Sequence, residues 1–168
     1  MVVMTLLPPG SRKDPAWYSD KAVFITGCDS GLGLSLATFC HEAGLVVVAA
    51  CHTQHDTRGA HHLQTIGSHT GRLVVITQFD VTNPECIASA RTRVDEVLAQ
   101  TSTRLWAVVN NAAVLVLANF EWQTSQLIER QIQVMLHCTG DDSLMSDSGQ
   151  SHGTHCCLQG VHTTSQAE

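Results

Sequence analysis

Basic residues are scarce in this sequence of 168 residues. Nine Lys and Arg side chains stand against fifteen Asp and Glu side chains, which gives a formal net charge of −6. The basic residues are scattered along the chain and form no cluster. Because nucleic-acid phosphates are bound by grouped Lys and Arg, this composition argues against a nucleic-acid partner.

Long hydrophobic runs are also missing. The first run, MVVMTLL, ends at Pro8 and Pro9, whereas a membrane-spanning helix needs about 20 apolar residues. The run has no basic start and no small-residue cleavage site, so it does not match a signal peptide. We therefore expect no transmembrane segment, and we interpret residues 1–20 as a leader that precedes the folded domain.

A regular cysteine framework is absent too. The seven cysteines are an odd number without regular spacing, which predicts reduced thiols and an intracellular protein, either cytoplasmic or peripheral to a membrane. Five potential metal ligands gather near the end of the chain, at His152, His155, Cys156, Cys157 and His162. Two adjacent cysteines without a second spaced pair fit a tetrahedral site poorly, so no metal site is predicted.

What is present is an alternation of short apolar runs and helix-like segments between residues 21 and 136. Four runs are mainly apolar instead of alternating, which is typical of strands buried on both faces: 22–25, 46–50, 73–79 and 105–109. Capping residues and apolar periodicity predict four helices: 32–43, 57–66, 84–100 and 124–136. This alternation predicts an α/β fold, with a parallel sheet in the order 3-2-1-4 flanked by helices.

A glycine-rich turn follows the first of these strands. The pattern Thr26-Gly27-x-x-x-Gly31-x-Gly33 lies between a strand and a helix, as a dinucleotide-binding fingerprint requires. Gly27 would let the chain turn sharply, Gly31 would let the backbone approach a pyrophosphate, and Gly33 would let the helix pack closely on the strand. The helix start would offer N–H groups and a positive dipole end to the phosphates. The alternative is a glycine-rich turn that binds nothing.

Three motifs in this order carry a family resemblance: TGCDSGLG at 26–33, FDVTN at 79–83 and LWAVVNNAA at 105–113. Together they resemble the short-chain dehydrogenase/reductases, in the branch that holds retinol, 17β-hydroxysteroid and 3-hydroxybutyrate dehydrogenases. The resemblance runs from about Lys21 to about Val134. It implies the N-terminal half of a Rossmann-like fold, from an NAD(P)-dependent oxidoreductase whose complete members act on a small lipophilic alcohol or ketone.

The resemblance also implies cofactor-binding residues. The pyrophosphate loop would consist of Gly27, Cys28, Asp29, Ser30, Gly31, Leu32 and Gly33. Asp80 and Val81 would contact the adenine, with the carboxylate accepting from the exocyclic amine, although Asp80 could instead be a turn or cap acid ahead of Pro84. The cofactor ribose would lie along Asn110, Asn111 and Ala112, which also brace the sheet. At the next position Ala113 replaces the family's glycine, so strain is expected there if the backbone needs a positive φ.

The cofactor type rests on the residues after the second strand, Ala50, Cys51 and His52. They provide neither the acid typical of NAD-specific members nor the arginine typical of NADP-specific ones. We predict NAD, because no cation is available there for a 2′-phosphate, and NADP is the alternative.

The catalytic half of the resemblance is missing. The family uses a Tyr-x-x-x-Lys pair, but the only tyrosine here is Tyr18, ahead of the first strand, and the only lysines are Lys13 and Lys21. Met135 stands at the position of the family's helix asparagine. We therefore predict no catalytic residue and interpret the chain as a truncated member that is inactive alone. The alternative is a non-catalytic nucleotide-binding or regulatory fragment, or a product without function.

The last segment, 137–168, differs in composition from the rest. It holds no Lys, Arg or aromatic residue and only isolated apolar residues, so we expect a disordered tail that is unrelated to the family. Without further strands, residues 105–109 would form an exposed sheet edge, through which self-association is expected.

Overall fold

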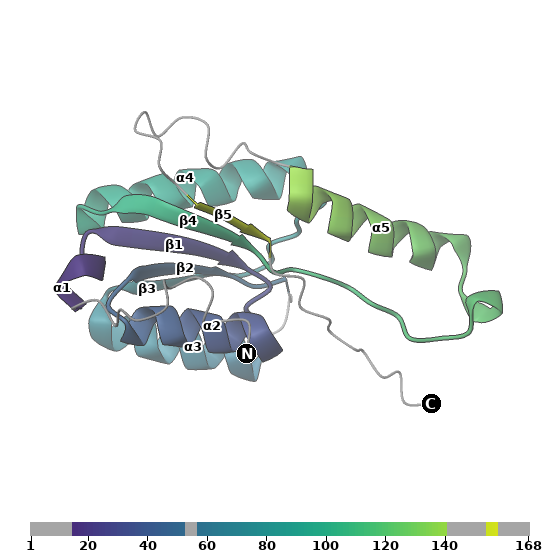
Figure 1. The fold of residues 1–168 in the computed structure, drawn as a ribbon, viewed down its shortest axis with the longest axis horizontal. Helices are drawn as coiled ribbons and strands as arrows, with labels where there is room; N and C mark the ends of the chain where they lie inside the picture. Colours follow the sequence, from purple (N-terminus) through teal and green to yellow (C-terminus); the bar gives the residue numbers. More distant parts are fainter. Residues whose placement is uncertain (1–14, 53–56, 141–153, 158–168) are drawn as a thin grey trace.

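A single parallel sheet forms the centre of the computed structural model, which describes residues 15–52, 57–140 and 154–157. Five strands lie in the order β3-β2-β1-β4-β5, and every neighbouring pair is parallel (Figure 1). The strands are β1 (Lys21–Thr26), β2 (Val46–Ala50), β3 (Leu73–Ile76), β4 (Arg104–Asn110) and β5 (Thr154–Cys157). The helices are α1 (Pro15–Tyr18), α2 (Gly31–Glu42), α3 (Arg58–Thr70), α4 (Pro84–Thr101) and α5 (Ser125–Gly140), with a 3-10 turn η2 (Phe120–Trp122). The predicted parallel α/β fold with flanking helices is confirmed.

Helices cover both faces of the sheet. On one face, Ile25 of β1 packs in a buried cluster with Leu36 of α2 and Leu63 of α3. On the other, Phe24 packs with Val97 of α4. Figure 1 shows α2 and α3 below the strands and α4 above them. Because β1 is buried on both sides along its whole length, its central residues, 22–25, are all apolar instead of alternating.

Element ends differ from the predicted ones where the backbone turns. The third strand ends at Ile76 and not at Phe79, because Gln78 adopts φ 60, a left-handed conformation that cannot continue a strand. Phe79 still enters the core and packs edge-to-face on Phe24, with ring centroids 5.8 Å apart. The next helix, α4, begins as predicted at Pro84, where the Asn83 side chain accepts a hydrogen bond from the Glu85 N–H at 2.9 Å.

The fifth strand is the main departure from the sequence prediction. The helix expected to end at residue 136 continues to Gly140, and β5 pairs with β4 over Ala107–Asn110. Backbone pairing needs no apolar side chains, which is why composition gave no sign of it. The edge over Ala107–Asn110 is therefore covered, contrary to the expectation of an exposed edge for self-association. The rest of the expected tail, 141–153 and 158–168, lies outside the described residues.

A charged and aromatic cluster closes the amino end of the sheet. The buried Lys21 ammonium lies 3.9 Å from the centre of the Trp17 ring and donates to the Asp20 carboxylate at 2.7 Å. Trp17 in turn packs edge-to-face on Trp106 of β4, at 6.0 Å between ring centroids. Tyr18 is buried in the same place. These residues stabilise the end of the sheet at which β1 begins.

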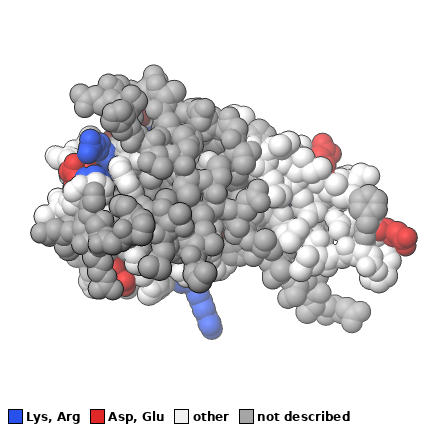
Figure 2. Space-filling view, in the orientation of Figure 1, with Lys and Arg blue, Asp and Glu red and all other residues white. Residues whose placement is uncertain are grey.

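Helix α5 stands apart from this compact body. It extends to the right of the sheet in Figure 1, at the end of the extended segment that follows β4. Four of its apolar side chains are exposed, Leu127, Ile132, Met135 and Leu136. The end of the molecule that includes α5 is largely uncharged in the view of Figure 2, with acidic atoms only at separate points. No helix in the described part of the chain is both long enough and apolar enough to cross a membrane.

Candidate functional site

A cavity of about 240 Å3 lies where β1 to β4 end and α5 approaches them. The carboxyl ends of parallel strands are where α/β sheets bind ligands, next to the point at which successive strands switch sides. Here that point lies between β1 and β4, since β2 and β3 follow on one side and β4 lies on the other. The lining residues are Gly27, Asp29, Ser30, His52, Phe79, Asp80, Val81, Thr82, Ala112, Ala113, Val114, Arg130 and Val134.

The glycine loop joins β1 to α2 at the cavity. Gly27 and Gly31 have φ of +70° and +58°, a region that favours glycine. A Cβ on Gly27 would also lie 2.8 Å from the Cα of Ala112. Ser30 precedes α2 in an extended conformation, and its side chain does not cap the helix. The first turn of α2 therefore directs its N–H groups and its positive dipole end toward the cavity side of the loop.

Gly33 allows α2 to lie directly on the end of β1. A Cβ at this position would overlap the carbonyl oxygen of Gly27 and lie 2.5 Å from the Asn111 amide nitrogen. The close helix–strand packing predicted for Gly33 is thus explained by these two contacts.

Asn111 ties the ends of β1 and β4 together beneath the loop. Its side chain is fully buried, and its Nδ2 donates to the carbonyl oxygens of Thr26 and Gly27, both at 3.0 Å. The Thr26 hydroxyl oxygen accepts from the backbone N–H groups of Asn111 and Ala112, at 3.0 and 2.9 Å. The Asn111 Oδ1 atom has no partner among the described residues. These bonds fix the backbone of the glycine loop against the segment that follows β4.

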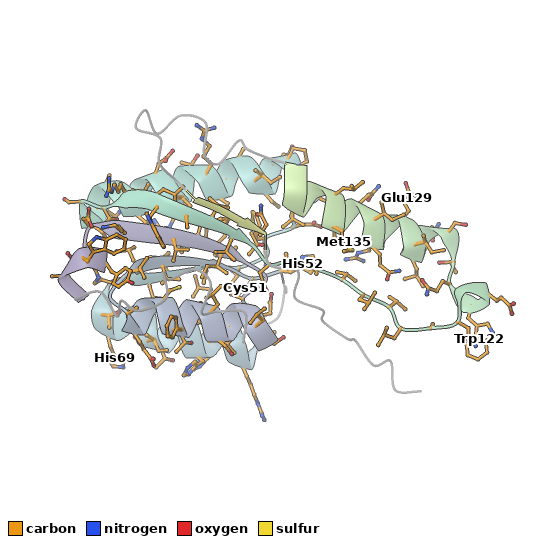
Figure 3. The ribbon with its side chains drawn as sticks, viewed as in Figure 1. Cys51, His52, His69, Trp122, Glu129 and Met135 are labelled. Atoms are coloured by element: carbon orange, nitrogen blue, oxygen red, sulfur yellow. The ribbon has the colours of Figure 1, made fainter. Side chains whose placement is uncertain are left out.

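Asp29 and His52 join the glycine loop to the end of β2. The Asp29 carboxylate accepts a hydrogen bond from the His52 backbone N–H at 2.9 Å. The His52 ring lies with Nδ1 3.3 Å from the Phe79 carbonyl oxygen. Figure 3 shows His52 at the centre of the molecule, between the sheet ends and α5. His52 is thus an exposed residue that lines the cavity.

Asp80 forms a tight turn at the far side of the cavity. Its Oδ1 accepts from the backbone N–H of Thr82 at 2.8 Å and from the Thr82 hydroxyl at 2.7 Å. Partial burial raises the pKa of Asp80, but the Thr82 bonds and the charges of His52 and Arg130 outweigh it, so the pKa lies below the ordinary value of 3.8. Asp80 is therefore a turn acid, while Asn83 supplies the helix cap; the turn leaves the residue at the cavity wall.

The low pKa of Asp80 predicts a pH effect on stability. A depressed pKa means that ionised Asp80 stabilises the folded chain above pH 3.8 and that this contribution is lost as the pH falls through the folded-state pKa. Asp80→Asn should therefore lower the urea midpoint at pH 6, and the difference from the wild type should shrink as the pH falls below 3.8. Paired urea titrations of the two chains measure this, and a difference that grows toward low pH would contradict it.

Half of the residues assigned by resemblance line the cavity. These are Gly27, Asp29, Ser30, Asp80, Val81 and Ala112, whereas Cys28, Gly31, Leu32, Gly33, Asn110 and Asn111 support it from behind or beside. Ala113 has no positive φ, so the strain considered for it does not arise. Met135 lies exposed on α5 outside the lining (Figure 3).

The buried cysteines near the loop are packing residues. Cys28 and Cys51 are fully buried and free. Burial raises the pKa of Cys51 to about 12, with Asp29 adding to the effect, and burial, together with Cys51, raises the pKa of Cys28. Such thiols are poor nucleophiles. Among the described residues no three His, Cys, Asp or Glu side chains are grouped to hold a metal; the side chains of 152, 155–157 and 162 lie outside them.

Fold, strand order and glycine loop together define an α/β domain of the Rossmann type. A family model described as short chain dehydrogenase matches residues 21–140. The chain is 39% identical to retinol dehydrogenase 16 of Rattus norvegicus and 41% identical to 17-beta-hydroxysteroid dehydrogenase type 6 of Homo sapiens, over 126 residues in each case. It therefore belongs to the short-chain dehydrogenase family, as its motifs predict.

These matches cover 74% of this chain but only 37% of each relative. Among solved structures, a short chain dehydrogenase from Bacillus anthracis superposes with a TM-score of 0.60 at 25% identity, covering 73% of this chain and 46% of that one. A short chain dehydrogenase from Leptospira borgpetersenii with bound NAD+ gives 0.56 at 22% identity, covering 73% and 42%, and shares the fold. The chain thus spans less than half the length of the proteins it matches.

Proposed function

We propose that this chain binds the adenosine and pyrophosphate end of NAD in the cavity between the glycine loop and Asp80. The observation that carries the proposal is the position of this cavity, at the carboxyl ends of the strands beside the first turn of α2. Dinucleotides bind at this place in Rossmann-type folds because N–H groups of the helix start meet the pyrophosphate. Residues 21–136 form the binding unit in this proposal.

The residues present fit such a ligand. Gly27 and Gly31 carry no side chain between the backbone and a phosphate, and Asp29 has its carboxylate engaged by the His52 N–H. Val81, Val114 and other apolar residues offer a surface for a base. The nicotinamide of a bound dinucleotide would supply hydride-transfer chemistry; this chain's residues would bind and orient the other end.

We propose NAD in preference to NADP because of the charged residues in the cavity wall. Asp29 and Asp80 are its two acids, and the end of β2 presents His52, whose backbone N–H is already bonded to Asp29. A 2′-phosphate would bring two further negative charges close to Asp29, and Arg130, on α5, is the single Lys or Arg among the described residues that line the cavity. NADP is therefore expected to bind more weakly.

Catalysis is not proposed for this chain alone. Tyr18 lies at the amino end of β1, while the cavity lies at the carboxyl end. Retinol and hydroxysteroids, after which the relatives are named, are the substrate class proposed for a complete protein that contains this half. A non-catalytic dinucleotide-binding protein inside the cell is the function we propose for the chain itself.

Two matched glycine variants test dinucleotide binding. Gly27 and Gly71 both have positive φ, but a Cβ on Gly27 meets Ala112 whereas one on Gly71 meets nothing within 4 Å. Both alanine variants carry the cost of a positive φ, of order 1 kcal/mol, and only Gly27→Ala disturbs the loop. By isothermal titration with NAD, Gly71→Ala should bind like the wild type and Gly27→Ala about tenfold or more weakly, from a combined cost of about 1.4 kcal/mol or more. Equal affinity of all three, or no binding by the wild type, would refute the proposal.

A further inference from the structure

Arg130 is the single Lys or Arg side chain among the described residues that line the cavity. It comes from α5, which none of the three sequence motifs reaches. Val134, four residues further along, lines the cavity as well, so the two side chains share one face of the helix. Val134 is buried there, while Arg130 lies nearer to solvent. Helix α5 therefore presents an apolar residue and a guanidinium side by side to the space opposite the glycine loop.

The charge of Arg130 acts on Asp80. It is one of the charges that favour the ionised carboxylate. No salt bridge among the described residues holds the Arg130 guanidinium, and Asp80 uses its Oδ1 for Thr82. Arg130 and Asp80 thus line the same cavity without an ion pair between them in the described part of the chain, so the guanidinium is available to a ligand there.

The surrounding wall suits a flat aromatic ring. Val81, Val114 and Val134 are apolar, and the carboxylate of Asp80 stands at the same end of the cavity. A planar guanidinium stacks on aromatic rings and attracts them through the cation–π effect, which a lysine ammonium does less well in this geometry. Gly27, Asp29 and Ser30 of the glycine loop, ahead of α2, line the same cavity, and the start of this helix is the group suited to phosphate.

We propose that Arg130 is a ligand-binding residue that covers the purine of the dinucleotide, against the apolar wall formed by Val81, Val114 and Val134. The inference rests on the proposed dinucleotide binding and adds a residue of α5 to it. It also assigns a specificity: Arg130 strengthens binding of ligands that carry a base and leaves binding of a bare pyrophosphate to the glycine loop.

Two probes and three variants test this assignment. The probes are ADP, which carries a purine and a pyrophosphate, and inorganic pyrophosphate, and their dissociation constants are measured by isothermal titration. Arg130→Ala should weaken ADP binding about 3- to 10-fold, as expected for a cation–π contact at a partly exposed site, and should leave pyrophosphate binding within about twofold. Arg130→Lys should recover part of the loss. The matched control is Arg93→Ala, an exposed arginine on α4 that pairs with Glu96 outside the cavity, and it should bind both probes like the wild type.

Each other outcome overturns the assignment. If Arg130→Ala binds ADP as tightly as the wild type does, Arg130 does not contact the ligand, although dinucleotide binding stands. If it loses pyrophosphate and ADP equally, the residue contacts phosphate and not the purine. If the wild-type chain binds no ADP, both this inference and the proposed function fail. Thermal melts of all variants show whether a loss of binding comes from unfolding. If Arg130→Ala is unfolded, the ADP affinity of Arg130→Lys relative to the wild type decides the assignment.

Discussion

Gly33→Val is expected to lose most of the stability of the folded chain and all dinucleotide binding. The new Cβ would overlap the Gly27 carbonyl oxygen and press on the Asn111 amide. Neither can move freely, because Asn111 is fully buried and its Nδ2 holds the carbonyls of Thr26 and Gly27. Overpacking of this kind costs about 1–3 kcal/mol or more, and each buried hydrogen bond left unmade costs about 1–3 kcal/mol further. Small domains have only about 5–15 kcal/mol in total.

The measurement is a urea titration followed by circular dichroism. Ser35→Ala is the control, since Ser35 lies exposed on the same helix and its hydroxyl bonds only to the Gly31 carbonyl; its midpoint should stay close to that of the wild type. A Gly33→Val chain with the wild-type midpoint would show that α2 can shift away from β1 without cost.

No dehydrogenase turnover is expected from this chain with retinol, hydroxysteroids or 3-hydroxybutyrate. A general acid/base must lie within hydrogen-bond reach of the substrate oxygen, and its proton transfer is worth roughly 10²- to 10⁴-fold in rate. Tyr18 is separated from the cavity by the length of β1, which at six residues is about 20 Å. Burial, with Cys40 nearby, also raises the pKa of Tyr18, which is the wrong direction for a group that must release a proton.

The assay is NADH formation by the purified chain, with a full-length family enzyme as the positive control. The signal should stay at the level of the blank for every substrate. Sustained turnover that Gly27→Ala abolishes and Tyr18→Phe leaves intact would contradict the prediction, because it would require a catalytic group that neither the motifs nor the described cavity contains.

Local sequence was sufficient for most of the fold. The central runs are strands buried on both faces, β1 and β2 along their whole length, and a continuous apolar run is the direct consequence of that burial. The end of β3 was mispredicted because Phe79 belongs to the core without belonging to the strand. The strand Thr154–Cys157 was not predicted, since it lies in a segment whose composition indicated disorder.

Part of the candidate site could likewise be predicted from the sequence, and part could not. Three of its residues, Gly27, Asp80 and Asn111, lie in short sequence motifs, each of which forms a single local turn. Such motifs are recognisable in the sequence, so these residues could be predicted. Arg130 and Val134 line the cavity because α5 returns toward the strand ends, a relation that depends on the whole chain and leaves no local pattern. The burial of Cys28, which turns its thiol away from the loop, also depends on the packing of β2 behind it.

The three tryptophans lie in different environments, so their fluorescence can report on different parts of the protein. Trp17 and Trp106 are in contact at the amino end of the sheet, with the Lys21 ammonium over the first of them, whereas Trp122 is 75% exposed beside the start of α5 (Figure 3). Emission from the first pair therefore reports the integrity of the sheet, and emission from Trp122, already in water, changes little when the sheet melts. A ligand that draws α5 toward the strand ends would change the emission of Trp122 and leave that of Trp17 and Trp106 unchanged. Fluorescence can therefore distinguish a movement of α5 from unfolding of the domain.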